Sequence, residues 1–121
     1  MIFRLLPLAA LFAVPAAAQP APEQGPPGAL SLQQSTALKC SAAFALGAAM
    51  QARNEGTEWP PLAERGREFF VQVSARVMDE TGRTREQVAA ELTGQAKALG
   101  EPGALAAAMP PCLLLLDASG L

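Results

Sequence analysis

Two cysteines, Cys40 and Cys112, are the feature that most constrains how this chain can fold. They are the only cysteines among 121 residues, so one intramolecular disulfide is the single pairing open to them. Such a bond closes a loop of about 70 residues, for which a chain-entropy model gives roughly 4 kcal/mol of stabilisation. A redox-active pair is the alternative, but redox cysteines usually stand close together as C-x-x-C. We therefore expect a structural disulfide that ties the start of the domain to its end.

The N-terminal segment indicates a compartment in which such a bond can form. Arg4 supplies a positive charge, residues 5–14 are apolar, and Ala16-Ala17-Ala18 offers a small-residue cleavage site. This order is typical of a secretory signal peptide, here residues 1–18. We expect cleavage after Ala18 and a periplasmic or secreted mature chain, where disulfides persist. An uncleaved N-terminal anchor is the alternative.

The mature chain divides into a short lead and one domain. Residues 19–30 are rich in proline, glycine and glutamine, a composition that favours a disordered or polyproline-like spacer. Residues 31–121 remain, which is the size of one small domain. A core of that size is only marginally large, so a covalent cross-link contributes much of its stability.

The spacing of apolar residues predicts an all-α fold. Three main helices are expected, over residues 32–54, 62–80 and 85–99. A fourth apolar segment covers residues 104–119, but Pro110-Pro111 is expected to break it, because proline lacks the N–H that a helix interior requires. Apolar and polar residues do not alternate with a period of two anywhere in the sequence, so no strand is predicted. We therefore expect a small irregular bundle of three main helices plus a broken C-terminal helix.

Two capping boxes support these helix starts. Ser31 is followed three residues later by Gln34, and Thr84 is followed in the same way by Gln87. In this motif, each side chain satisfies a backbone N–H of the other residue. The sequence therefore places the first turns of the first and third helices next to Ser31 and Thr84.

The middle of the first predicted helix, Cys40–Met50, is almost wholly apolar and rich in alanine. A helix that is apolar all round is buried on several sides. Its length is too short to cross a membrane, which requires about 20 apolar residues. We expect this segment at the centre of the bundle, where Ala43 and Gly47 allow a neighbouring helix to approach closely.

The chemistry that the chain lacks excludes most functional classes. Histidine is absent, which removes the usual general base, the Ser-His and Cys-His pairs and most zinc sites. Glycine-rich phosphate loops are also missing. Nine basic residues against eleven acidic ones give a net charge of −2 without a basic run, which argues against nucleic acid as a partner. We predict a protein that is not an enzyme and uses no cofactor or metal.

Two carboxylate pairs carry the remaining catalytic possibility. Glu64 and Glu68 stand one turn apart in the second predicted helix, and Asp79 and Glu80 are adjacent at its end. Paired carboxylates perform acid–base work when their surroundings separate their pKa values. Arginines neighbour the first pair, so a solvated, ion-paired helix face is favoured. A carboxylate-only hydrolase is the least favoured hypothesis.

Two apolar features are candidate interaction sites. Trp59 lies in a proline-flanked turn, where it either covers one end of the core or forms an exposed binding anchor; covering the core is favoured. Four consecutive leucines near the C-terminus cannot all face one side of a helix. They either fill a crease between helices or leave an apolar patch on the surface. These leucines are Leu113, Leu114, Leu115 and Leu116.

The functional prediction is correspondingly broad. We expect a small exported, non-catalytic protein that binds either an envelope protein or a small apolar ligand. The alternative is an envelope-surface protein that makes a peripheral membrane contact through its C-terminal leucines.

Export makes a direct prediction about the mature N-terminus. Mass spectrometry of the protein isolated from an envelope or secreted fraction is expected to find a chain that begins at or near Gln19. Recovery of the intact chain, starting at Met1, from the cytosol would contradict the signal-peptide assignment.

Overall fold

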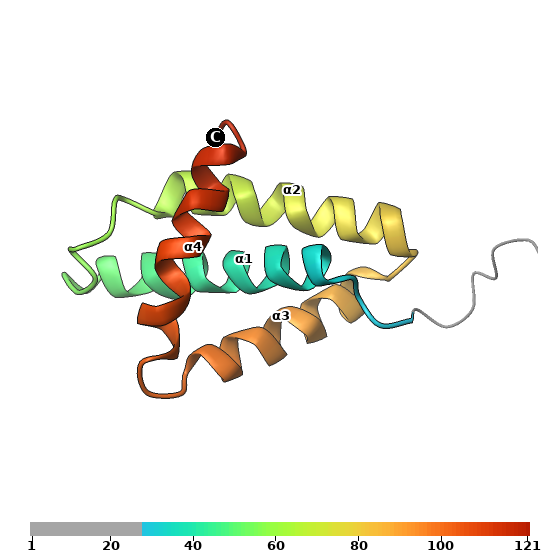
Figure 1. Cartoon of the computed structure of the whole chain (residues 1–121), viewed down its shortest axis with the longest axis horizontal. Coiled ribbons are helices and arrows are strands. Elements are labelled where there is room, and N and C mark those ends of the chain that lie inside the picture. The colour runs from blue at the N-terminus through green and yellow to red at the C-terminus, as the bar shows by residue number, and fades with distance from the viewer. Residues whose placement is uncertain (1–27) are drawn as a thin grey trace, which may run out of the picture.

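The computed structural model describes residues 28–121, which form four α-helices (Figure 1). Strands are absent from this part of the chain, so the predicted all-α class is confirmed. The predicted signal peptide, residues 1–18, and residues 19–27 of the predicted lead lie outside the described residues. The helices are α1 Leu32–Gln51, α2 Ala63–Thr81, α3 Arg85–Leu99 and α4 Ala104–Ala118.

The end of the lead contacts the domain. Residues 28–30 have no regular secondary structure. The Nη2 atom of Arg83 donates a hydrogen bond of 2.7 Å to the backbone carbonyl of Gly28. Leu30 packs partly buried against the core. The last residues of the lead are therefore attached next to the turn between α2 and α3.

Both predicted capping boxes are confirmed. At α1, the Ser31 hydroxyl accepts from the Gln34 N–H at 3.1 Å, and the Gln34 side chain accepts from the Ser31 N–H at 3.0 Å. The equivalent distances between Thr84 and Gln87 at α3 are 3.2 and 2.8 Å. These bonds satisfy N–H groups that have no partner within the helix. As a result, α1 and α3 begin where the sequence places them.

The ends of the helices agree less well with the prediction. The bounds of α3 match, and Gly82 ends α2 in the left-handed conformation with φ 71°. However, α1 ends at Gln51, three residues early, and Asn54 adopts a positive φ of 62° in the turn that follows. Asparagine tolerates that conformation, so the chain leaves the helix before Gly56.

Helix α1 lies at the centre of the domain. In Figure 1, α2 and α3 flank it on opposite sides, and α4 crosses in front of it. From Leu38 to Phe44 every residue except Lys39 is buried. The buried hydroxyl of Ser41 is satisfied, because it donates to the Ala37 carbonyl at 2.9 Å. The predicted central position is confirmed for the first part of the apolar segment, Cys40–Phe44, whereas Ala45 and Ala49 in its second part are exposed.

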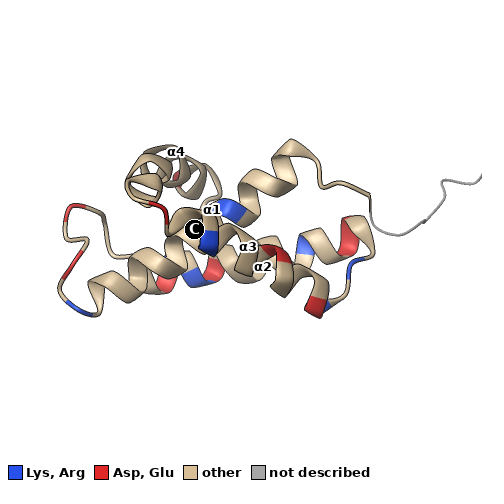
Figure 2. Cartoon of the chain, turned by 90° about the horizontal axis from the view of Figure 1, so that it is seen from below, with Lys and Arg blue, Asp and Glu red and all other residues tan. Residues whose placement is uncertain are grey.

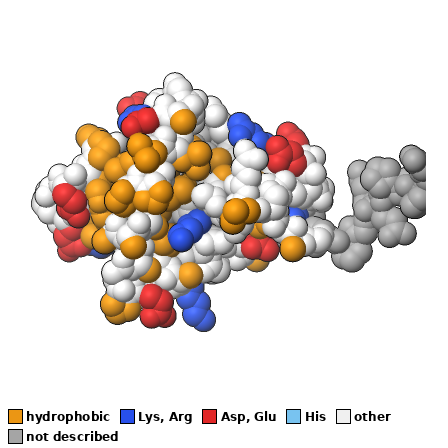
Figure 3. Space-filling model, viewed as in Figure 1, with side chains coloured by type: hydrophobic (Ala, Val, Ile, Leu, Met, Phe, Trp, Pro, Cys, Tyr) orange, Lys and Arg blue, Asp and Glu red, His pale blue; other side chains and the backbone are white. Residues whose placement is uncertain are grey.

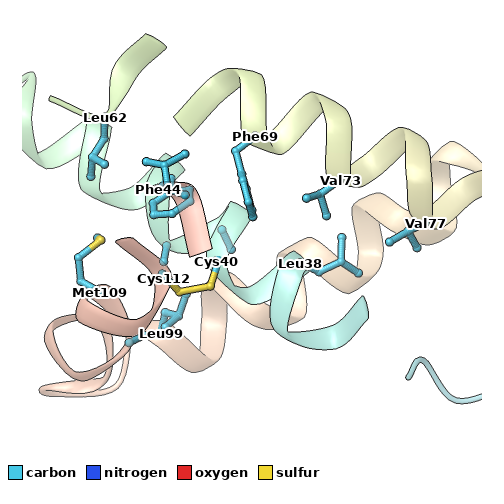
Figure 4. Close-up of a cluster of buried hydrophobic side chains, with 14 of the residues drawn as sticks. Leu38, Cys40, Phe44, Leu62, Phe69, Val73, Val77, Leu99, Met109 and Cys112 are labelled. Carbon is cyan, nitrogen blue, oxygen red and sulfur yellow. A yellow bond between two sulfur atoms is a disulfide. The ribbon is translucent and has the colours of Figure 1, made fainter. Parts of the chain in front are cut away.

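Small residues let α2 and α4 approach α1 closely. The rings of Phe44 and Phe69 meet edge to face, with centroids 5.2 Å apart (Figure 4). A Cβ atom on Gly66 of α2 would lie 2.8 Å from the Phe44 Cβ atom. A Cβ atom on Gly47, the close-approach position predicted in α1, would lie 2.7 Å from Leu62 Cδ1. The interhelical distances therefore depend on these two glycines.

The disulfide between Cys40 and Cys112 joins α1 to α4 (Figure 4), as predicted. Its Cα atoms are 5.1 Å apart, within the usual range for a disulfide, and both residues are buried. A structural disulfide is compatible with a protein outside the cytoplasm. Across residues 28–121, no helix has the length and apolar character needed to cross a membrane.

The predicted break in the C-terminal helix is wrong, because α4 continues through Pro110 and Pro111. Each proline deprives the carbonyl four residues earlier of its helical donor, here Ala106 and Ala107. All four residues are exposed, so water can satisfy these carbonyls. The opposite side of the helix is held in the core by Met109, Cys112 and Leu116.

The disulfide is expected to contribute much of the stability of the domain. Replacing Cys40 and Cys112 together by alanine removes a cross-link worth roughly 4 kcal/mol, so the melting temperature is expected to fall by more than about 15 °C. Thermal melts followed by circular dichroism measure the effect. The control is the wild type with a thiol reductant, which should lower its melting temperature but leave that of the double variant unchanged. If the unreduced wild type and the double variant had the same melting temperature, this role of the disulfide would be contradicted.

Two glycines inside helices provide a matched pair of substitutions. Gly66→Ala is expected to lower the free energy of unfolding by about 1–3 kcal/mol, because the new methyl group overlaps Phe44. A Cβ atom on Gly94 of α3 would have no neighbouring atom within 4 Å. Gly94→Ala is therefore expected to raise the free energy of unfolding by roughly 0.5–1 kcal/mol, because alanine has the higher helix propensity. Chemical denaturation of both variants tests the pair. Equal effects of the two substitutions would show that Gly66 is not a close-packing position.

Candidate functional site

The apolar face of α2 is wider than the part that α1 covers. Phe69, Val73 and Val77 of α2 are buried in the core. A second row of apolar side chains on α2, Phe70 and Met78, is only partly buried. This second row faces a groove between α2 and α3.

The groove has a volume of about 490 Å³, within the range of small-molecule sites. Most of its lining is apolar, and it includes Val71, which is 56% exposed. The lining residues come from two helices. They are Phe70, Val71, Ser74, Ala75 and Met78 of α2, and Arg85, Val88, Ala89 and Leu92 of α3.

Ser74 belongs to the lining of this apolar groove. Its Oγ atom is buried and has no hydrogen-bond partner among the described residues. Three other helical hydroxyls donate to the carbonyl four residues earlier, which is the usual solution: Ser41 to Ala37, Thr81 to Val77 and Thr93 to Ala89. An unsatisfied buried hydroxyl costs about 1–3 kcal/mol, so Ser74 is a position where a ligand can restore a missing bond.

Arg85 is the charged residue of the lining. It is the first residue of α3, its side chain is exposed, and it forms no ion pair within residues 28–121. The two ion pairs in that range are formed by Arg53 with Glu55 and by Arg65 with Asp117. The groove thus combines apolar walls with a hydroxyl group and an unpaired guanidinium.

The four C-terminal leucines are divided between the core and the surface. Leu116 is fully buried, and Leu113 packs partly buried against the core. Leu114 is 72% exposed and Leu115 is 37% exposed. Leu113 and Leu116 therefore pack between the helices, whereas Leu114 and Leu115 leave an apolar patch on the surface. Figure 3 shows hydrophobic side chains gathered over the part of the surface formed by α4.

A second groove lies beside the exposed leucines. It has a volume of about 430 Å³ and a mainly apolar lining that includes both cysteines of the disulfide. Thr36 and Lys39 of α1 belong to one wall, and Pro111, Leu114 and Leu115 of α4 belong to the other. We call this feature the α1–α4 groove.

Trp59 packs at the other end of α1. It is partly buried against the core. Its Cε3 atom would lie 3.0 Å from a Cβ atom on Gly56 and 3.5 Å from one on Gly47. These contacts favour a covering role over an exposed anchor. Gly47 lies eight residues beyond Lys39, about 12 Å along the helix axis, so Trp59 and Leu114 contact different parts of α1.

The side chain of Gln51 holds the loop that carries Trp59. Its Nε2 atom lies 2.9 Å from the Pro60 carbonyl and 3.3 Å from the Trp59 carbonyl, and donates to both. Its Oε1 atom accepts from the Leu62 N–H at 2.9 Å. This single side chain therefore fixes the connection between α1 and α2.

The four candidate carboxylates do not form a site. Glu64, Glu68, Asp79 and Glu80 are all exposed, and Glu80 accepts a hydrogen bond of 3.0 Å from Gln34. In the ribbon of Figure 2, acidic and basic residues are interspersed along the chain. Within the described range, no three potential metal ligands lie together. That the protein is not an enzyme stays a prediction.

Reasoning from the sequence missed the α2–α3 groove and its two polar residues. The available signal was the width of the apolar face of α2, which includes Phe70 and Met78 as well as the buried row. Ser74 stands between them at intervals of four residues, on the same side of the helix.

Comparisons of the chain with models of protein families, with curated proteins and with solved structures gave no match.

Proposed function

We propose that this protein is a non-catalytic binding protein and that the α2–α3 groove takes a small molecule with an apolar body and a polar group. The buried hydroxyl of Ser74, without a hydrogen-bond partner in the described structure, carries this proposal. A protein interior rarely leaves such a group unsatisfied unless something else completes it. A bound ligand would supply the missing partner once the Ser74 side chain rotates toward the groove.

The surroundings of Ser74 support a ligand rather than a helix as that partner. The apolar walls lie on both α2 and α3, so they already enclose the groove from two sides. Val71 remains 56% exposed at its edge, and its burial by a ligand would remove apolar surface from water. The volume suits a molecule of modest size, whereas a further helix would need a longer and wider face.

Filling the groove tests this function. Ala89 and Ala90 are neighbouring exposed residues of α3, and only Ala89 belongs to the groove lining. The neutral fluorescent probe N-phenyl-1-naphthylamine is expected to bind the wild type and the Ala90→Trp variant, but to bind Ala89→Trp at least tenfold more weakly. Thermal melts serve as the folding control. Equal probe binding by the two tryptophan variants, or no binding by the wild type, would contradict the proposal.

The exposed leucines of α4 favour a second candidate function, contact with a partner protein at the α1–α4 groove. Leu114 is 72% exposed, which is unusual for a leucine beside other apolar side chains. The surface there is hollow and accepts an inserted side chain, as protein partners provide. The exposed cation of Lys39 at its wall favours an acidic residue on the partner.

Photo-crosslinking tests this second function. A photoreactive residue at position 114 is expected to yield one protein adduct of defined mass, and Lys39→Glu is expected to abolish it. The same probe at Leu32, which is 84% exposed on another part of α1, is the control. Sedimentation with phosphatidylglycerol vesicles that is lost in Leu114→Ser would instead favour the lipid contact. Adducts at both positions, or at neither, would contradict a specific protein site.

A further inference from the structure

We infer that the ligand of the α2–α3 groove is an anionic amphiphile, an alkyl chain that ends in a carboxylate. This inference rests on the proposed function and adds the chemical class of the ligand. It follows from the kind of polar groups in the lining and from their place in the groove.

Both side-chain polar groups of the lining donate hydrogen bonds. The Ser74 hydroxyl can donate and accept, whereas the Arg85 guanidinium only donates and always carries a positive charge. The lining contains no acidic side chain to neutralise that charge. A complementary head group therefore offers acceptor atoms and a negative charge. A carboxylate meets both conditions, and its two oxygens match the planar fork of one guanidinium.

The place of Arg85 gives the ligand a direction. Arg85 follows the short turn that joins α2 to α3, so it lies at the end of the groove nearest Met78. The N-terminus of α3 lies at this end and adds its own partial positive charge. Phe70 and Leu92 lie further from the turn, at the apolar end. The head group therefore belongs at the turn, and the chain runs away from it.

The length of the groove indicates the length of the chain. Phe70 and Met78 are eight residues apart, which corresponds to about 12 Å along α2. Between them the walls offer only aliphatic and aromatic side chains apart from Ser74. An alkyl chain of medium length, about ten carbons, extends along that distance. Longer chains would project into water and gain little further burial.

Three amphiphiles that differ only in the head group test the inference. Isothermal titration calorimetry compares decanoate, decan-1-ol and decylamine, each below the concentration at which it aggregates. Decanoate is expected to bind the wild type about two- to fivefold more tightly than decan-1-ol, and decylamine is expected to bind most weakly. An ion pair with an exposed guanidinium contributes about this much. Since Arg85 is exposed, the preference for decanoate should also shrink as salt is added.

Two arginine substitutions separate the head-group contact from general effects. Arg85→Gln is expected to weaken decanoate binding about two- to fivefold and to leave decan-1-ol binding unchanged. Arg76→Gln, an exposed arginine of α2 outside the groove lining, is the matched control and should change neither. Arg85→Lys keeps the charge and is expected to retain the preference for decanoate. Circular dichroism verifies that each variant is folded.

The outcomes distinguish this inference from the proposed function. If decanoate and decan-1-ol bind equally well, or if Arg85→Gln weakens both alike, the anionic head group is wrong while an apolar site remains. A preference for decylamine would likewise overturn the inference. If neither the three amphiphiles nor the neutral naphthylamine probe bind the wild type, both the inference and the proposed function fail.

Discussion

The enclosure of α1 by the other three helices is the constraint on which the rest of the domain depends. Small side chains such as those of Ser41, Ala42 and Ala43 keep α1 narrow in its buried middle, from Leu38 to Phe44, so three neighbouring helices fit around it. Each outer helix packs mainly against α1. Because α2 and α3 pack more on α1 than on each other, they leave a groove between them. The candidate site therefore exists because α2 and α3 both pack against the central helix α1.

Local signals in the sequence predicted the parts of the fold that depend on nearby residues. Ser31 and Thr84 cap their helices through bonds that span three residues, so a short motif suffices to locate them. The pair Pro110-Pro111 misled the prediction because proline was judged by its local effect alone. Its cost depends on which side of the helix faces water and on the disulfide beside it. Both are properties of the folded domain.

The candidate site was less predictable for the same reason. An apolar patch at Leu114 was one of two interpretations that the sequence left open, since four adjacent leucines must point in different directions. The α2–α3 groove was not, because its existence depends on how far two helices diverge after a short turn. In the sequence, Ser74 resembles Ser41, and each stands four residues after a carbonyl it could bond. Only the folded chain distinguishes the satisfied hydroxyl from the unsatisfied one.

The disulfide also gives the domain a closed covalent outline. Cys40 and Cys112 enclose the whole of α2 and α3 in a ring of backbone that is completed by one sulfur–sulfur bond. If a protease cut the exposed turn at Gly82, α2 would remain attached to α1 through the preceding loop. Helix α3 would remain attached through α4 and the disulfide. Both walls of the groove would therefore stay in one molecule, and a nicked chain would retain the parts needed to reassemble its binding site.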